Sequence, residues 1–219
     1  LGFKSEGTNL NLRYQNNTLI ADSLFGIKYN LSNFDINKYG FNHVTSEKTM
    51  GLYQNNNASQ LAILTDGIYN NIDFTVNTLD NQTSLLNALS GLNLNYFKRV
   101  PSQLFDQDAK SLNQRVAKNV SNSNKDFVTI TYRVIAPPHS QLYVSIPNIS
   151  WSDDNNHSLS ITVNGVTRNQ VTDNTFDFFD LGYFETESMV TIKLSFPGNK
   201  AISFDNPSFY ALDTKNYQI

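Results

Sequence analysis

Apolar and polar residues alternate along most of the second half of the chain, and this alternation is typical of strands with one buried face. Turn residues separate the alternating runs, notably Pro137-Pro138, Asn164-Gly165 and Pro197-Gly198. Six strand-length runs result: residues 127–136, 141–147, 158–166, 175–184, 189–196 and 202–212. Runs of this length with turn chemistry at each break predict an antiparallel β-sandwich. We therefore expect residues 98–219 to form a jelly-roll sandwich similar to carbohydrate-binding modules.

One turn in this region is predicted in detail. Asn164 and Gly165 lie between Val163 and Val166. Asparagine and glycine tolerate the positive φ angles of a type I′ turn, so this segment predicts a tight hairpin.

The first part of the chain mixes strand and helix patterns. Residues 8–14 alternate and predict a strand. Asn17 or Thr18 can cap a short helix that runs through Leu24 and ends at Gly26, because a side-chain oxygen accepts a hydrogen bond from a free N–H of the first turn. Three further strands are expected at residues 27–31, 50–56 and 59–68.

A second helix is predicted from leucines at helical spacing. Asn81 or Thr83 is its expected N-cap and Gly91 its expected end. The leucines are Leu85, Leu86, Leu89 and Leu92. The fold expected is thus mainly β, with a small α+β region over residues 1–97 followed by the β-sandwich domain over residues 98–219.

Composition narrows the classes of partner. The 219 residues carry a net charge of −3, with acidic and basic residues interspersed. Nucleic acid is not expected as a partner, because no cluster of basic residues could follow a phosphate backbone. The chain has 31 asparagines, a residue type that favours turns, and no cysteine. A chain of this length needs no disulfide or metal to be stable.

The chain shows no segment that would place it in a membrane by itself. No apolar run approaches the roughly 20 residues of a membrane span, and no signal peptide opens the sequence. The sequence begins at Leu1 without an initiator methionine. We therefore expect it to be a fragment of a larger protein.

Searches for catalytic and metal-binding motifs give no assignment. His43, His139 and His157 lie far apart, and none has the spacing of a zinc site. No nucleophile elbow, phosphate-binding loop or dinucleotide motif occurs. No catalytic residue, metal ligand or cofactor is therefore predicted for this chain.

Four carboxylates lie close together in sequence: Asp177, Asp180, Glu185 and Glu187. Two carboxylates at one site could perform acid/base chemistry on a glycoside. A structural interpretation is favoured, because Asp177 and Asp180 interrupt an aromatic strand while Glu185 and Glu187 flank a turn. The aromatic residues of that strand are interpreted as core, with Phe176 and Phe178 on one face and Phe179 on the other.

Three residues at one end of the predicted sandwich are candidate ligand-binding residues: Trp151, Asp153 and Asp154. An exposed Trp151 could stack on a sugar face. A buried Trp151 would anchor the loop that follows, and burial is favoured because large aromatic side chains are mostly buried. The run 153–156 is oxygen-rich, but it does not match a calcium loop and is expected to be solvated.

Three segments in the first half of the chain form a characteristic set: DSLFGIKYNL (residues 22–31), GLYQNNNASQLAIL (51–64) and DNQTSLLNALSGL (80–92). In this order and at this spacing they resemble the YfhO family of bacterial membrane proteins. The second segment departs from the family pattern, since Gln54 replaces a typical glutamate, Gln60 a proline and Ala62 a glycine. The downstream YVSI, ITVNG and DLGYF strands also suit the C-terminal β domain of the family.

The resemblance implies a setting for the chain. Family members resemble membrane glycosyltransferases that use a lipid-phosphate sugar donor and glycosylate teichoic-acid-type polymers of the cell envelope. Their expected catalytic acid lies in an early extracytoplasmic loop among the membrane helices, a region outside this sequence, so no catalytic residue is transferred to this chain. The chain is then expected on the extracytoplasmic face of the cell membrane, attached through transmembrane segments that it does not contain.

Three functions remain open at this point. The leading hypothesis is a domain that binds or positions a cell-envelope glycopolymer without catalysing the transfer. The first alternative is a structural or protein-interaction domain with no glycan contact. The second is a hydrolase built on Asp177 and Asp180.

Overall fold

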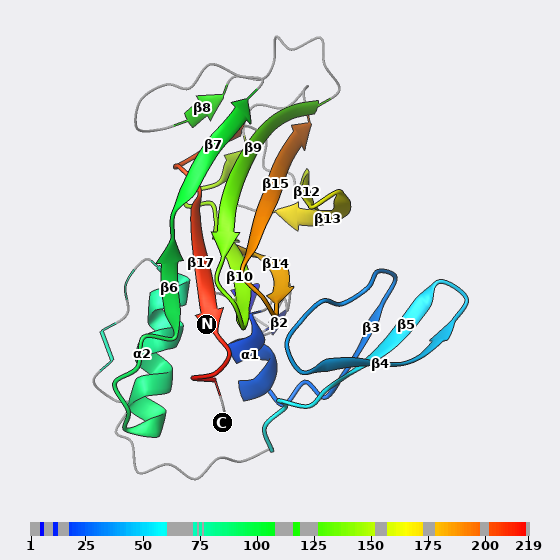
Figure 1. Cartoon of the computed structure of the whole chain (residues 1–219), viewed down its shortest axis with the longest axis vertical. Helices are drawn as coiled ribbons and strands as arrows, with labels where there is room; N and C mark the ends of the chain where they lie inside the picture. The colour runs from blue at the N-terminus through cyan, green and yellow to red at the C-terminus, as the bar shows by residue number, and fades with distance from the viewer. Residues whose placement is uncertain are drawn as a thin grey trace.

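The computed structural model describes the chain over eleven segments: residues 5–6, 11–12, 18–60, 72–73, 75, 77–107, 116–118, 127–151, 157–172, 178–197 and 202–217. Two antiparallel sheets packed face to face form its main body (Figure 1). The five-stranded sheet has the order β13 (Val166–Thr172), β12 (His157–Val163), β15 (Ser188–Pro197), β9 (Phe127–Ala136) and β7 (Ser102–Gln107). The four-stranded sheet has the order β14 (Phe178–Phe184), β10 (Ser140–Ser145), β17 (Ser208–Asp213) and β6 (Phe97–Val100).

The main hydrophobic core lies between these two sheets. Alternate residues of β15 are buried, and Val190, Ile192 and Leu194 have no exposed surface. They meet inward-facing residues of the opposite sheet such as Leu142 and Val144. The prediction of a mainly β fold with an antiparallel sandwich is confirmed.

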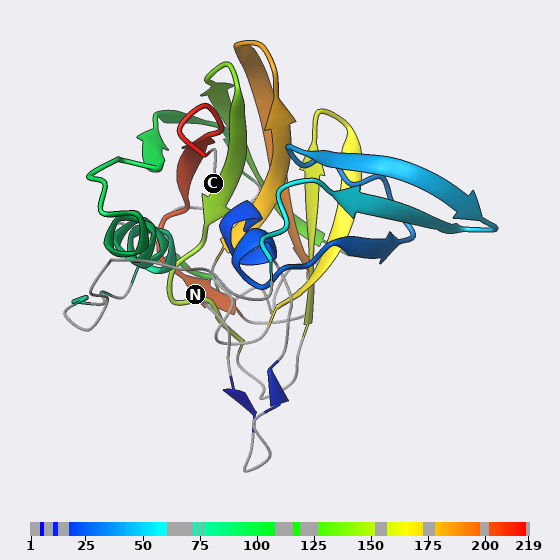
Figure 2. The ribbon, with the colours of Figure 1, turned by 90° about the horizontal axis from the view of Figure 1, so that it is seen from below.

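Three smaller sheets complete the described strands. A three-stranded sheet of β3 (Tyr29–Ser32), β5 (Met50–Asn55) and β4 (Phe41–Glu47) projects from one side of the sandwich, and we call it the wing (Figure 2). A second contains β11 (Ser150–Trp151), β16 (Ile202–Phe204) and β8 (Val116–Lys118). The third is a ribbon of β1 (Ser5–Glu6) and β2 (Asn11–Leu12).

Two helices, α1 (Leu19–Leu24) and α2 (Thr78–Ser90), pack near the outer face of the four-stranded sheet (Figure 1). A second hydrophobic core forms there, in which Leu19 and Leu86 pack in one cluster with Tyr143 and Phe178. This cluster contains residues from both sides of position 97. The division into regions 1–97 and 98–219 stays a prediction.

The ends of the two helices test the capping residues that were predicted from the sequence. Thr18 is the N-cap of α1, as expected, and its hydroxyl accepts a hydrogen bond from Ala21 N at 3.1 Å. Gly91 ends α2 in the left-handed region with φ 68°, also as expected. The predicted N-cap of α2 was wrong, since Asn77 accepts hydrogen bonds from Leu79 N and Asp80 N. The helix therefore begins before Asn81, because several capping residues follow one another here.

The strand predictions are confirmed for most of the sandwich. The strand at residues 127–136 has its predicted bounds, and Asn164 and Gly165 have positive φ angles of 48° and 89° in the expected hairpin. The single run 202–212 is in fact two strands, β16 and β17, in different sheets. The break falls at Asn206-Pro207, because proline cannot donate a hydrogen bond within a sheet.

Other predicted strands are tested in part. The strand at 27–31 corresponds to β3 and that at 50–56 to β5. Of residues 8–14, only Asn11–Leu12 are described, as β2, and most of the run 59–68 lies outside the described residues. The strands β4, β6 and β7 and most of β13 were not predicted, because their burial does not alternate in a regular pattern.

The two main sheets differ in width, and this difference positions the candidate site. On β13, Val166, Arg168 and Gln170 are paired with Val163, Ile161 and Leu159 of β12. Directly paired residues share a face, so the three β13 side chains point to the inner side of the sandwich. The four-stranded sheet ends at β14, and these side chains line open space instead of meeting another strand.

The hydroxyl of Tyr143 offers a test of how α1 is held. It accepts a hydrogen bond from Leu19 N at 3.0 Å in a fully buried position. The substitution Tyr143→Phe leaves this N–H without its partner, and we expect it to lower the free energy of unfolding by about 1–3 kcal/mol. Urea denaturation measures this. Tyr132→Phe is the control, since no hydrogen bond of the described chain uses the Tyr132 hydroxyl; an equal loss in both variants would contradict the assignment.

Candidate functional site

The segment that connects β3 to β4, residues 33–40, crosses the open edge of the sandwich, and we call it the strap. Asn37 O accepts a hydrogen bond from Tyr183 N at 3.1 Å, and Asn37 Nδ2 donates to Tyr183 O at 3.3 Å. The strap thus continues the four-stranded sheet beyond its edge strand β14. A Cβ at Gly182, where φ is 110°, would lie 2.8 Å from Asn37 Nδ2. Glycine is required at this position because the strap lies so close.

The side chain of Gln141, on the central strand β10, forms hydrogen bonds with the strap. Its amide oxygen accepts a hydrogen bond from Tyr39 N at 3.0 Å. Its amide nitrogen donates to Asn37 O at 3.3 Å and to Asp180 Oδ1 at 2.8 Å. Gln141 has no exposed surface, so these hydrogen bonds satisfy a buried side chain and connect the strap to β14.

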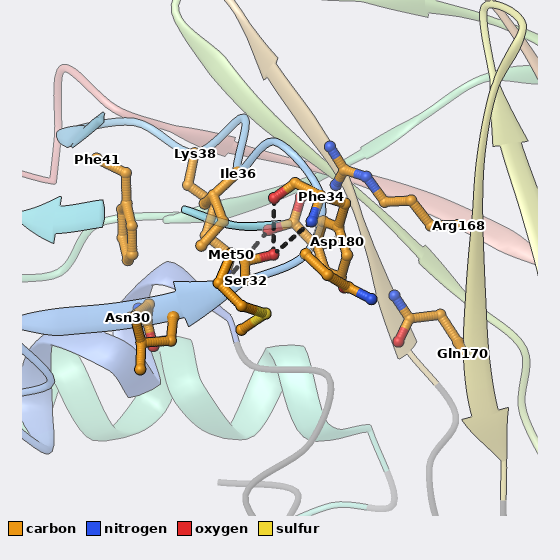
Figure 3. A pocket seen from close by; sticks show the side chains of 12 residues that line it. Asn30, Ser32, Phe34, Ile36, Lys38, Phe41, Met50, Arg168, Gln170 and Asp180 are labelled. Carbon is orange, nitrogen blue, oxygen red and sulfur yellow. Dashed lines mark hydrogen bonds and ion pairs between the residues drawn. The ribbon is translucent and has the colours of Figure 1, made fainter. Parts of the chain in front are cut away.

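A cavity of about 370 Å³ lies between the strap, the wing and the sandwich edge, and we call it the polar chamber (Figure 3). It combines two cations, one carboxylate, several amides and two aromatic rings. Its principal side chains are Asn30, Phe34, Lys38, Phe41, Arg168, Gln170 and Asp180.

A second cavity of about 300 Å³ lies on the other side of the strap, and we call it the apolar chamber. Phe34, Ile36 and Lys38 of the strap line the polar chamber, whereas Asp35 and Asn37 line the apolar one. Most of the remaining lining of the apolar chamber is aliphatic or aromatic: Ile161, Val163, Val166, Leu181 and Phe184. The two chambers share Arg168, Gln170 and Asp180, and together they form the cleft discussed below.

Lys38 lies between two carboxylates. Its Nζ is 2.7 Å from Asp22 Oδ2 and 3.9 Å from Asp180 Oδ2. Asp22, on α1, is fully buried. Burial lowers the pKa of Lys38, but the attraction of Asp22 and Asp180 outweighs it, so the pKa lies above its ordinary value. Lys38 therefore stays charged and anchors the strap to α1.

Asp180 is the carboxylate of the polar chamber. Its Oδ1 accepts hydrogen bonds from Gln141 Nε2 and Gly182 N, both at 2.8 Å. Its Oδ2 is buried and accepts no hydrogen bond from the described residues. Burial raises the pKa of Asp180 above its ordinary value, although Lys38 and these hydrogen bonds act in the opposite direction. The site thus holds one acceptor whose hydrogen-bonding capacity is not met.

Arg168 brings a cation to the boundary of the two chambers. Its Nη2 donates to Asp35 O at 2.8 Å, and its guanidinium carbon lies 5.2 Å from the centre of the Phe34 ring. A guanidinium has five N–H donors, so the contact to Asp35 leaves donors for an anionic ligand. Figure 3 shows Arg168 and Gln170 side by side on β13, reaching towards the polar chamber.

The candidate residues of the sequence analysis lie elsewhere. Trp151 is 4% exposed, and its ring packs edge-on against His157 and Phe196 at centroid distances of 4.7 and 6.5 Å. The burial that was favoured for Trp151 is confirmed. Asp153 and Asp154 lie outside the described residues. A ligand-binding role for these three residues stays a prediction.

The described carboxylates near β14, which are Asp180, Glu185 and Glu187, differ in their surroundings. Asp180 lines both chambers of the cleft, whereas Glu185 and Glu187 are exposed. Glu185 accepts a hydrogen bond from the Tyr183 hydroxyl and lies 3.2 Å from His139 Nδ1. Asp177 and Phe176 lie outside the described residues, and Phe178 and Phe179 belong to the two different cores, as their alternation predicted.

The lining of the polar chamber is suited to binding a ligand. Among the described residues that line the polar chamber, Asp180 is the one carboxylate, and no group of three potential metal ligands is found in the described part of the chain. Donors and acceptors around two aromatic rings can bind hydroxyl groups and an anion. Lys38 and Arg168 were not singled out from the sequence, because the ligand site arises only where strap and β13 meet.

Solved structures are similar to only part of this chain, whereas a protein family matches its whole sequence. A carbohydrate esterase of family two from Cellvibrio japonicus aligns at 8% identity and a TM-score of 0.29, over 53% of this chain and 31% of its own. A ruminal GH26 endo-beta-1,4-mannanase aligns at 18% identity and a TM-score of 0.22, over 40% and 19%. A comparison with curated proteins finds no match. The family described as "Bacterial membrane protein YfhO" matches residues 1–219.

No helix in the described part of the chain has the length and apolar character needed to cross a membrane.

The Lys38–Asp22 pair can be tested by removing one or both charges. We expect Lys38→Met to lower the free energy of unfolding by about 3–5 kcal/mol, because it leaves the buried Asp22 carboxylate without its cation. Asp22→Asn added to Lys38→Met should recover most of this loss. Urea denaturation of the two single variants and the double variant measures the coupling, and additive effects would contradict it.

The pKa of Asp180 predicts a pH dependence. Because this pKa is raised above 3.8, the folded chain holds the proton more tightly than the unfolded chain. The contribution of Asp180 to the stability of the wild-type protein therefore falls as pH rises from 3.8 through the folded-state pKa of this residue. Asp180→Asn keeps the Oδ1 acceptor but does not titrate, so it should gain stability relative to wild type over this range. Urea denaturation at several pH values from 4 to 8 measures the difference, and a constant or falling difference would contradict the assignment.

Proposed function

The chain belongs to the YfhO family of bacterial membrane proteins, and from this premise we propose that it binds or positions a cell-envelope glycopolymer. In this proposal the chain is the extracytoplasmic region of a membrane protein that resembles glycosyltransferases of teichoic-acid-type polymers. Transfer of the sugar takes place in the membrane part, and the cleft holds the acceptor.

The polar chamber carries this proposal. A polymer of polyols and phosphates offers hydroxyl groups and anionic oxygens at short intervals. Arg168 supplies N–H donors for an anion, and Asp180 lines the same chamber. The side-chain amides of Asn30 and Gln170 line the same chamber and make no hydrogen bond within the described residues. Phe34 and Phe41 provide apolar surface for the carbon side of a sugar or polyol.

Binding through one cationic residue is expected to be weak and dependent on salt. The local charge of the polar chamber is balanced, since Lys38 is paired with Asp22 and Asp180. Arg168 is therefore the main attraction for an anion, and exposed charges are screened at physiological ionic strength. Repetition along a polymer would strengthen the contact by raising the local concentration of binding groups.

The binding proposal can be tested by nuclear magnetic resonance titration of the chain with teichoic-acid fragments. We expect shifts at the amides of the strap and of β13, and Arg168→Gln should weaken binding about tenfold, as loss of a charged hydrogen bond does. Arg133→Gln is the matched control. Arg133 is exposed on the outer face of the five-stranded sheet, with its guanidinium carbon 3.6 Å from the Phe105 ring centre. No shift at millimolar fragment would contradict acceptor binding.

A protein-interaction role is the second candidate, and one observation favours it. The wing exposes several apolar side chains. Tyr29, Leu31, Val44 and Met50 are 54%, 71%, 50% and 41% exposed. Exposed apolar groups that gather on one projecting sheet are typical of contact surfaces. In this alternative the wing contacts another envelope protein, and polymer fragments cause no shifts in the cleft.

A further inference from the structure

The polar and apolar chambers share one boundary. Arg168, Gln170 and Asp180 line both of them. The strap runs between the chambers with successive side chains on opposite sides. A ligand at Arg168 is therefore in contact with a polar space on one side of the strap and with an apolar space on the other.

The apolar chamber exists because the four-stranded sheet is too narrow to cover β13. Ile161 and Leu181 form its floor and are each 3% exposed, within the main core. Val166 lines it from β13 and is 63% exposed, although its side chain points to the inner side of the sandwich. The Asn164-Gly165 hairpin holds Val166 in this position. The result is an apolar opening that leads into the sandwich core from its edge.

Water fills such an opening at a cost, because Val163, Val166 and Phe184 offer it no hydrogen bonds. An apolar chain in the same space would release that water and continue the packing of the core. The charged group of such a ligand stays at the boundary, beside the charged and amide side chains, because burying a charge without a partner is costly. The chemistry that fits both chambers is thus an anionic group joined to a short apolar chain.

We propose that the cleft binds an anionic amphiphile, with its anionic group at Arg168 and its apolar chain in the apolar chamber. This inference rests on the proposed function for the anionic group at Arg168, and it adds the apolar chamber as a second part of the site. Gln170 donates to the anionic group from β13, and Val166 and Phe184 contact the chain. The ligand is either a membrane lipid or a free alkyl phosphate, since both have this chemistry.

A series of alkyl phosphates tests the proposal at a constant headgroup. Calorimetric titration of the whole chain with methyl, butyl, hexyl and octyl phosphate, all as monomers, measures the affinity as the chain grows. Each methylene that enters the apolar chamber should tighten binding about three- to fourfold. An affinity that does not depend on chain length would overturn the proposal.

Three variants separate the two parts of the site. Val166→Asp places a charge in the apolar opening and should remove the dependence on chain length. Arg168→Gln should weaken every member of the series about tenfold and leave that dependence in place. Val44→Asp is the matched control, since Val44 is an exposed valine of the wing that lines neither chamber, and it should bind like wild type. A dependence on chain length that persists in Val166→Asp would show general adsorption and would also overturn the proposal.

Vesicles distinguish the two sources of ligand. Co-sedimentation with phosphatidylglycerol vesicles that Val166→Asp abolishes and Val44→Asp retains would identify a membrane lipid. Binding of octyl phosphate without sedimentation would identify a free amphiphile, and both results support the site. The teichoic-acid titration separates this inference from the proposed function. If fragments bind while the alkyl series shows no trend, the inference fails and the proposed function stands; if the series shows the trend while fragments do not bind, polymer binding fails.

Discussion

The unequal width of the two main sheets is the constraint on which the rest of the structure depends. The five-stranded sheet extends past β14 by the strand β13, whose inward side chains have no strand opposite them. A sandwich edge left open in this way exposes both a core and unpaired backbone groups of β14. The strap covers part of that edge by pairing Asn37 with Tyr183, and the space it leaves on each side becomes a chamber. Cleft and fold therefore have the same physical origin.

Buried polar groups make the position of the strap specific. Gln141 and Asp22 have no exposed surface, so each loses hydration on folding and needs a protein partner. The strap supplies those partners through Tyr39 N and Asn37 O for Gln141, and through Lys38 for Asp22. Apolar contacts alone would allow the strap to shift along the sandwich edge, whereas these hydrogen bonds and this ion pair require one geometry. These contacts fix the position of the strap, and with it that of the wing, relative to the sandwich.

Family membership and the cleft contribute different parts of the functional argument. Membership connects the chain to a bacterial membrane protein, and it assigns no chemistry to any residue of the chain. The cleft provides the chemistry: Arg168 as donor, Asp180 as a partly satisfied acceptor, and aromatic and apolar walls. These groups are the basis on which binding is proposed for the site.

The sequence by itself determined the elements whose signals are local. Alternation predicted β9, β12 and β15, a threonine before an apolar run predicted α1, and Asn164-Gly165 predicted the hairpin that positions Val166. Where several capping residues lie within a few positions the prediction was wrong, as at the N-cap of α2, which is Asn77 whereas Asn81 or Thr83 was expected. The burial of Trp151 followed from its size. The candidate site depends on the tertiary structure, because Lys38, Arg168 and Asp180 come from three separate segments of the chain. The pattern of apolar and polar residues does not predict how far one sheet extends past another.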